Sequence, residues 1–351
     1  MRYVYCTLFD INYTVKGIAM LLSLRECSPE ARIYVLALDD KTAECIGKYD
    51  ISGICLIKYE DFIHHLKIRN NMTHTEFCWS CSANLLQYVF DYYQEEYCTY
   101  IDADMIFYSN PSCLIDEMIK KNKSVQIIEH RFTMDQYGKD CMKKFGRFCV
   151  EFNTFHNDEE GMKVLKDWIN QVDYCCSETA MNNVFGDQKY LDKWIEKFEC
   201  VSICENELAG IAPWNIDQYR LVKMEQNIPV IKRKKSGTMG KIIFYHFHGI
   251  EEVEDGKVNI AVYRIHWKVD GKLVEWVYKT YIERLKIIQI TLEKQLKGEL
   301  RLFKKGSEKG KDVFKTQILK RMSGLYWKNI FWNIEMRFKS LKAKDKDIFR
   351  V

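Results

Sequence analysis

The sequence predicts an α/β protein with a mostly parallel sheet that helices cover on both faces. Three observations lead to this fold class. Short apolar runs alternate with helix-like segments, the runs are rich in Val, Ile and Tyr, and acidic residues follow several of them directly. With 351 residues, of which 47% are apolar and 29% charged, the chain can bury a sizeable core.

The alternation begins at the N-terminus and continues to about residue 200. Strands are expected at 3–9, 32–38, 54–57, 97–101, 124–128, 148–154 and 242–247. Helices are expected at 17–25, 83–93, 161–172 and 189–198. In a parallel sheet, ligands bind at the carboxyl ends of the strands. The polar residues that follow the strands at 3–9 and 97–101 are therefore candidates for the functional site.

Charge is distributed unevenly along the chain. Residues 301–351 carry 15 Lys/Arg and 5 Asp/Glu, a net charge of +10, whereas residues 1–300 have a net charge of −6. An acidic body argues against a nucleic-acid enzyme, whose working face should be basic. We expect a cytoplasmic protein, because the sequence shows neither a signal peptide nor an apolar run of membrane-spanning length.

The 14 cysteines are scattered rather than spaced as a disulfide framework, and reduced, buried thiols are the expected state. One pair, Cys78 and Cys81, forms a C-x-x-C at the start of an expected helix. A thiol-redox or zinc-binding module is an alternative function for this pair, although a zinc site needs a second pair of ligands.

Two motifs carry metal-binding residue types. Asp102-Ala103-Asp104 directly follows an apolar strand, so both carboxylates can reach one hard divalent cation. His246 and His248 end a later strand, and an imidazole could complete a mixed oxygen and nitrogen ligand set that suits Mn²⁺.

Five segments in order carry a resemblance to a known family. They are Asp10-Ile11-Asn12-Tyr13, Asp102-Ala103-Asp104, Phe152-Asn153-Thr154, Asp187-Gln188 and His246-Phe247-His248-Gly249. They match the D-x-N-Y, D-x-D, F-N-x, D-Q and H-x-x-G motifs of the retaining GT-A glycosyltransferases of family 8. The sequence more closely resembles bacterial cell-surface sugar transferases related to that family, over roughly residues 1–250.

The resemblance implies a UDP-sugar donor and a Mn²⁺ (or Mg²⁺) cofactor. Asp10 and Asn12 would contact the edges of the uracil, and Tyr13 would stack on its face. The alternative for Asn12 is a cap at the start of the first helix. The implied nucleotide contacts are Asp10, Asn12, Tyr13, Asp102 and Gly249. The implied metal ligands are Asp102, Asp104 and His246, with His248 as the rival imidazole.

The resemblance also implies residues that line the donor sugar, namely Asn153, Asp187 and Gln188, with Gln188 nearest the anomeric carbon. Because a glutamine amide is a poor nucleophile, this favours a front-face retaining mechanism based on positioning and electrostatic stabilisation. The alternative for Asp187 is an N-cap of the helix expected at 189–198. A second D-Q pair, Asp217-Gln218, is interpreted as a decoy, with Trp214 as a platform for the acceptor.

The sequence departs from the family pattern at two places. Members of the family have a lysine that contacts the diphosphate shortly after the H-x-x-G, but here no lysine occurs until Lys257, and Lys279 is a distant alternative. The arginine-bearing helix ahead of the D-x-D is replaced by a Cys-rich segment, 77–81.

The basic tail completes the predicted organisation: a catalytic domain at 1–290 and a basic, amphipathic helical region at 291–351. Apolar residues recur every three or four positions from Ile318 to Leu341 among lysines and arginines. This pattern is typical of a helix on an anionic membrane surface, here the inner face of the cell membrane, and equally of a helix packed on the catalytic domain.

The sequence therefore predicts a Mn²⁺-dependent glycosyltransferase that moves a sugar from a UDP-sugar to a saccharide or lipid-linked glycan. A sugar nucleotidyltransferase is an alternative, but it should have a Gly- and Lys-rich loop after the first strand, which residues 7–15 lack. A non-catalytic sugar-nucleotide binder is the third possibility.

Overall fold

The computed structural model describes residues 3–67, 72–180, 184–254, 257–260, 262–266, 268–296 and 348–350. Its centre is a seven-stranded sheet in the order β3-β2-β1-β4-β7-β6-β8, in which β7 is antiparallel to both neighbours and the other pairings are parallel. These strands are β3 (Ile54–Lys58), β2 (Arg32–Ala37), β1 (Val4–Phe9), β4 (Tyr97–Ile101), β7 (Phe148–His156), β6 (Val125–Glu129) and β8 (Val201–Ile203).

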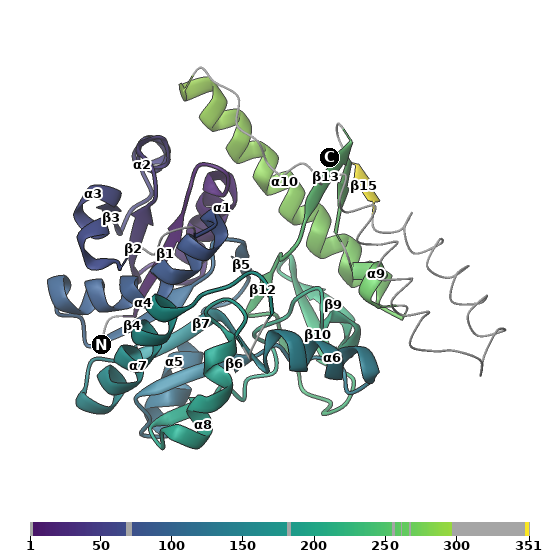
Figure 1. Ribbon diagram of the computed structural model, residues 1–351. Coiled ribbons are helices and arrows are strands. Elements are labelled where there is room, and N and C mark those ends of the chain that lie inside the picture. The colour runs from purple at the N-terminus through teal and green to yellow at the C-terminus, as the bar shows by residue number, and fades with distance from the viewer. Residues whose placement is uncertain are drawn as a thin grey trace.

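Helices cover both faces of this sheet, so the predicted α/β fold class is confirmed (Figure 1). One face packs against α4 (His74–Tyr93), α7 (Glu159–Tyr174), the 3-10 turn η2 (Lys189–Lys193) and α8 (Trp194–Lys197). The other face packs against α1 (Thr14–Cys27), α2 (Asp40–Tyr49) and α5 (Ser112–Lys120). Alternate residues of β1 enter the two cores, as the two-residue period of a strand requires.

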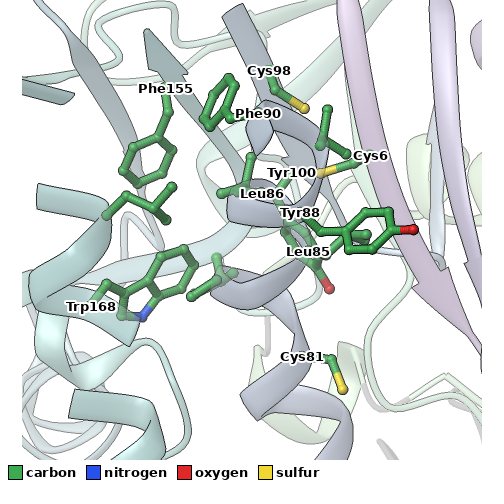
Figure 2. Packing of buried hydrophobic residues seen from close by; sticks show 14 of the residues in the cluster. Cys6, Cys81, Leu85, Leu86, Tyr88, Phe90, Cys98, Tyr100, Phe155 and Trp168 are labelled. Atoms are coloured by element: carbon green, nitrogen blue, oxygen red, sulfur yellow. The ribbon is translucent and has the colours of Figure 1, made fainter. Parts of the chain in front are cut away.

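Apolar packing between α4 and α7 holds the first face. Leu86 of α4, Phe155 of β7 and Trp168 of α7 belong to one buried cluster (Figure 2). Phe155 and Trp168 stack with ring centroids 6.0 Å apart. Large buried side chains of this kind supply most of the hydrophobic stabilisation of such a layer.

A second group of elements lies beyond the end of the main sheet. It contains a sheet of β9 (Tyr219–Glu225), β10 (Ile228–Arg233) and β11 (Met239–Lys241), and a short antiparallel pair of β5 (Met105–Phe107) and β12 (Phe244–His246). The long helix α10 (Gly271–Leu296) packs on α1 (Figure 1). The antiparallel pair of β13 (Glu251–Glu254) and β14 (Lys257–Asn259) is extended by a third strand, β15 (Ile348–Arg350). The remaining short elements are α3 (Tyr59–Phe62), η1 (Ile63–His65), α6 (Gln136–Phe145), η3 (Ile216–Gln218) and α9 (Val262–Ile265).

The expected elements of the first 175 residues are confirmed, with helices α1 and α4 longer than expected. The strand expected at 242–247 is partly wrong, because β11 ends at Lys241 and only Phe244–His246 is a strand. The segment 189–198 is a 3-10 turn followed by one short α-helix.

The predicted amphipathic helix of the tail lies outside the described residues. Helix α10 continues through residue 290 to Leu296, and β15 pairs with β14 of the first predicted domain. The division at residue 290 stays a prediction. Among the helices of the described ranges, none combines the length and apolarity that crossing a membrane requires.

Candidate metal and nucleotide site

Two neighbouring parallel strands bring the first site carboxylates to one edge of the sheet. β1 and β4 pair through Tyr5 and Thr99, and their ends lead into Asp10 and Asp102. As the sequence predicts, both carboxylates lie at the carboxyl edge of the parallel strands.

The pairing of β12 with β5 brings His246 to these carboxylates. His246 lies opposite Met105, the residue after Asp104, and the Phe247 amide donates to the Asp104 carbonyl at 2.8 Å. The His246 Nε2 atom is consequently 3.0 Å from an Asp104 carboxylate oxygen and 3.8 Å from one of Asp102. The structure thus brings together the three residues expected as metal ligands, from segments more than 140 positions apart.

Glu151 fixes the orientation of the His246 ring. This glutamate lies on β7, is fully buried, and has a carboxylate oxygen 2.6 Å from His246 Nδ1. With Nδ1 bonded to a carboxylate, Nε2 is directed at Asp102 and Asp104; metal-binding histidines commonly have such a partner. Sequence analysis missed Glu151, although a lone acidic residue inside an apolar strand was a usable signal.

The electrostatics of the cluster show how strongly these groups interact. Burial alone would lower the pKa of His246, but the Asp104 carboxylate outweighs burial and holds it well above its ordinary value. Burial would raise the pKa of Asp104, and the opposing attraction of His246 holds it below its usual range. Burial raises the pKa of Asp102 to about 7, because His246 only partly offsets it and Asp104 adds repulsion.

The donor set fits a divalent cation with mixed oxygen and nitrogen ligands. Two overlapping groups each place their donor atoms within 4.8 Å of one another: Asp104, His246 and His248, and Asp102, Cys149 and His246. Burial raises the pKa of the Cys149 thiol to about 12, and Mn²⁺ prefers oxygen ligands over a soft thiolate. Carboxylates with imidazole suit Mn²⁺ better than Mg²⁺, which prefers oxygen alone.

The turn after β1 is held by Asp10. Its carboxylate accepts hydrogen bonds from the backbone amides of Asn12 and Tyr13 at 3.0 and 3.2 Å and from the Asn12 side-chain amide at 2.8 Å. His74 lies 2.7 Å from its second oxygen. The alternative role of Asn12 as the cap of the first helix is wrong, because the N-cap residue is Tyr13. The Tyr13 side chain makes no capping hydrogen bond.

Tyr13 presents an aromatic ring beside the cluster. Its side chain is 42% exposed, and it interacts electrostatically with Asp104, Asp10 and Asp102. The ammonium of Lys16, one turn later on α1, lies 4.4 Å from the centre of the ring. This lysine, buried in the floor of the site, was also missed by sequence analysis.

Of the residues expected at the donor sugar, Asn153 and Asp187 are buried and Gln188 is half-buried. Asn153 is fully buried, and neither polar atom of its amide has a hydrogen-bond partner within the described part of the chain. Asp187 accepts a bond from Ser82 at 2.7 Å, and burial raises its pKa to about 7. The N-cap of the following turn is Gln188, so the expectation that Asp187 caps it is wrong. The Gln188 amide donates to the Phe145 carbonyl at 2.7 Å.

Gly249 and Trp214 border the site on the side of His248. Gly249 adopts a φ of +75°, a conformation that favours glycine and turns the chain after the two histidines. The Trp214 ring lies 5.4 Å from His246 and 5.6 Å from His248, centroid to centroid. His248 is exposed, whereas Trp214 is half-buried and its indole nitrogen is buried.

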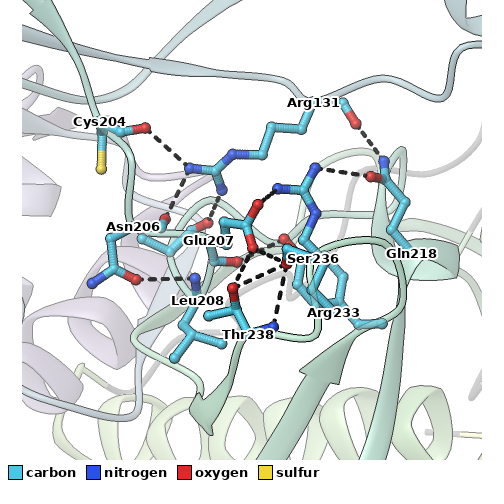
Figure 3. Close-up of polar contacts among 11 residues, drawn as sticks. Arg131, Cys204, Asn206, Glu207, Leu208, Gln218, Arg233, Ser236 and Thr238 are labelled. Atoms are coloured by element: carbon cyan, nitrogen blue, oxygen red, sulfur yellow. Dashed lines mark hydrogen bonds and ion pairs between the residues drawn. The ribbon is translucent and has the colours of Figure 1, made fainter.

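The second D-Q pair, Asp217 and Gln218, makes contacts within the protein. Gln218 donates to the Arg131 carbonyl and accepts from Arg233, within the polar network that fixes the loop bearing Trp214 (Figure 3). Asp217 lies 3.5 Å from the buried His266.

The cysteine pair Cys78 and Cys81 lies within α4 rather than ahead of it. Burial raises the pKa of Cys78 to about 12 and that of Cys81 well above its ordinary value, so both thiols stay protonated. All 14 cysteines lie in the described residues and all are free. In those residues, the groups that could hold a metal both contain His246.

Comparison with known proteins gives relatives of similar length. No protein-family model matches the sequence. The chain is 26% identical over 291 residues to YfnD of Bacillus subtilis (strain 168), an uncharacterized protein, covering 80% of this chain and 88% of YfnD. YfnF of the same organism, also uncharacterized, is 24% identical over 307 residues, covering 85% of this chain and 97% of YfnF.

Similar solved structures include the bifunctional glycosyltransferase WbbM, with a TM-score of 0.47 and 10% identity over 81% of this chain and 49% of that one. This chain therefore spans about half the length of WbbM. The galactosyltransferase LgtC, in complex with donor and acceptor sugar analogs, has a TM-score of 0.46 and 16% identity, covering 70% of this chain and 87% of LgtC. Mouse xyloside xylosyltransferase 1 has a TM-score of 0.43 and 11% identity, covering 71% of this chain and 98% of that one. These neighbours are glycosyltransferases.

Proposed function

We propose that the protein is a metal-dependent glycosyltransferase of the GT-A type that uses a nucleotide diphosphate sugar as donor. The observation that carries this proposal is the meeting of Asp102, Asp104 and His246 at the carboxyl edge of the sheet, with Glu151 orienting the imidazole. Such a cluster beside an exposed aromatic ring suits a ligand that combines a planar base with a phosphate chain.

In this proposal Asp102, Asp104 and His246 hold Mn²⁺, or Mg²⁺, next to the diphosphate. The cation would stabilise the negative charge that develops on the departing nucleotide. The protein contributes a preorganised site, since Glu151 keeps Nε2 of His246 directed at the carboxylates before any ligand arrives.

The turn Asp10 to Tyr13 would hold the uracil of a UDP-sugar, as the family resemblance implies. Asp10 is already bonded to His74 and to the Asn12 amide nitrogen, so its first task is to orient Asn12. Held in this way, the Asn12 side-chain carbonyl can accept a hydrogen bond from the base while Tyr13 stacks on it. Gly249 would allow the chain to pass close to the nucleotide.

Asn153, Asp187 and Gln188 would line the donor sugar. The buried, unpartnered amide of Asn153 favours a ligand contact, because burying a polar group without a partner is costly. The Gln188 amide donates a hydrogen bond to the Phe145 carbonyl, which fixes the orientation of the amide. This supports a positioning role for Gln188, and with it a retaining, front-face reaction.

The acceptor in this proposal is a saccharide or a lipid-linked glycan that approaches over Trp214.

Peripheral attachment to the inner face of the cell membrane through residues 301–351 belongs to the same proposal. Replacing Lys315, Lys320 and Lys328 with Gln should release the protein from anionic liposomes and leave donor hydrolysis intact. Unchanged liposome binding by this variant would contradict the attachment.

The test is thermal unfolding of the protein with a panel of nucleotide sugars, with and without Mn²⁺. A ligand at 100 times its Kd that binds only the folded state adds about 2.7 kcal/mol to the free energy of unfolding, a measurable rise in Tm. We expect such a rise with a UDP-sugar only when Mn²⁺ is present. Asp104→Asn should abolish it, whereas Asp140→Asn, an exposed change on α6, should not. A folded protein whose Tm no nucleotide sugar changes would contradict the proposal.

A further inference from the structure

A second set of metal-ligand side chains overlaps the first and includes a cysteine. The donor atoms of Asp102, Cys149 and His246 lie within 4.8 Å of one another. Asp102 and His246 also belong to the proposed Mn²⁺ site, whereas Cys149 belongs to the second set alone. Cys149 and His246 are buried, and the side chain of Asp102 is 29% exposed, so an ion would enter past Asp102.

The pairing of β7 with β4 places Cys149 near these two residues. The strands run antiparallel, and where β4 ends the Asp102 amide donates to the Glu151 carbonyl at 3.3 Å. Cys149 lies two residues from Glu151 on the same strand, and its thiol interacts with the His246 imidazole. One strand thus contributes both the carboxylate that orients His246 and the thiol beside it.

A buried thiol can simply fill space, and Cys149 belongs to the same apolar cluster as Ile128 and Phe152. Packing accounts for its burial but does not require two side chains of metal-binding type within its reach. Among the described residues, no other cysteine belongs to a group of three potential metal ligands. This position therefore distinguishes Cys149 from the other buried thiols.

The two sets suit different metals. Mn²⁺ prefers oxygen with imidazole, whereas Zn²⁺ also binds thiolate and often takes three protein ligands with water in the fourth position. A coordinating thiol gives up its proton to the solvent when the metal binds. Zn²⁺ also binds a given set of nitrogen, oxygen and sulfur ligands more tightly than Mn²⁺. A zinc ion held by the second set would occupy Asp102 and His246, and Mn²⁺ would lose both.

We propose that Asp102, Cys149 and His246 bind Zn²⁺, and that zinc at this place excludes Mn²⁺ and so inhibits sugar transfer. The zinc site depends on its donor set alone, whereas the exclusion of Mn²⁺ rests on the proposed function. Sensitivity to zinc then depends on a thiol that is not among the ligands of Mn²⁺.

The experiment uses the full-length protein and follows each metal by its own signal. Co²⁺ is the spectroscopic probe of the zinc site, because a thiolate ligand gives it a charge-transfer band in the near ultraviolet. Zn²⁺ is also titrated into protein loaded with Mn²⁺, and the spin resonance signal of released Mn²⁺ is recorded. Cys149→Ser and Cys149→Ala remove the thiol. The matched control is Cys78→Ser, which removes a thiol 3.7 Å from Nε2 of His74.

We expect the Co²⁺ charge-transfer band in the parent and in Cys78→Ser, and no band in either Cys149 variant. Both Cys149 variants should need at least about tenfold more Zn²⁺ to release the same amount of Mn²⁺, because losing even the hydrogen-bond partner of a metal ligand costs about tenfold. Their affinity for Mn²⁺ should change less than about twofold, since Mn²⁺ does not use the thiol; this also shows that the variants are folded.

A Co²⁺ charge-transfer band that persists in Cys149→Ala would overturn the inference, and so would release of Mn²⁺ from that variant at the Zn²⁺ concentration that suffices for the parent. If the parent bound no Mn²⁺, the proposed function would fail instead, and the Co²⁺ band would still decide whether the zinc site exists.

Discussion

The region of residues 3–174 and the region of residues 184–296 differ in how their elements are connected and contribute different parts of the site. In the first, strands and helices alternate around two apolar cores, and the carboxylates Asp10, Asp102 and Asp104 follow strand ends. In the second, short strands and the helix α10 pack around a third apolar core that also includes residues of α1, and polar contacts between distant residues hold the loops. This region contributes His246 and Trp214. The metal cluster is formed only where the two regions meet, at the pairing of β5 with β12.

The polar contacts that hold the loops of the second region centre on two arginines, Arg131 from the first region and Arg233 from the second. Arg131 donates to the carbonyls of Cys204, Asn206 and Ala209, and Arg233 pairs with Glu207, which also accepts from Ser236 and Thr238 (Figure 3). These bonds connect the end of β6 to the loop 204–218 and the β9–β11 sheet. The difference teaches that local apolar patterns specify the first region, whereas the second adds long-range polar bonds to an apolar core that it shares with α1.

The largest effect should come from the apolar core of the first region. Leu86→Ala should lower the free energy of unfolding by about 2–5 kcal/mol, because Leu86 of α4 is fully buried in the apolar cluster that α4 shares with α7. Chemical denaturation measures this loss, and Ile287→Ala, an exposed change on α10, is the matched control. Mn²⁺ affinity of the folded protein should be unchanged; a loss of metal binding would show that the metal site depends on this core.

A smaller loss of stability should follow from breaking the polar network. Arg131→Met removes a charged donor from three carbonyls and should cost about 1.5–3 kcal/mol. Unlike Leu86→Ala, it should also speed amide hydrogen exchange within 204–218 under native conditions, because those carbonyls hold the loop. The control is Arg220→Met, an exposed arginine on β9. Equal exchange in Arg131→Met and the parent would contradict the assignment of this loop to the network.

The smallest effect concerns the contact between Glu151 and His246. Glu151→Gln keeps an acceptor for Nδ1 but removes the charge that makes the imidazole more basic, so the affinity for Mn²⁺ should fall about tenfold. Calorimetric titration with Mn²⁺ measures it, and Glu129→Gln, whose salt bridge to Arg147 is half-exposed, is the control. Unchanged affinity would mean that Glu151 only fills space in the core.

The sequence predicts the first region well because its signals are local. Apolar runs such as that of β2 and the acidic residues after β1 and β4 are visible within a few residues of one another. The order of the motifs also places His246 and the Asp pair in one site, but only through family resemblance. What brings His246 there is its pairing with Met105, a contact between residues 141 positions apart that no local pattern encodes.

Residues that act through burial were the hardest to predict. Lys16 reads as an ordinary helix surface residue, and Glu151 as an interruption in a strand. Their importance depends on which side chains surround them, and that is set by the packing of α1 and β7. The caps given as alternatives for Asn12 and Asp187 were wrong, because the Asn12 amide donates to Asp10 within the same turn and Asp187 accepts from the distant Ser82.

The most direct test of a metal centre shared by the two regions is the nitrogen hyperfine coupling of protein-bound Mn²⁺, measured by electron spin echo. The account predicts a coupling from one imidazole in the parent protein that persists in His248→Gln and disappears in His246→Gln. Bound Mn²⁺ that keeps its nitrogen coupling in His246→Gln would contradict the account, and so would a folded protein that binds no Mn²⁺.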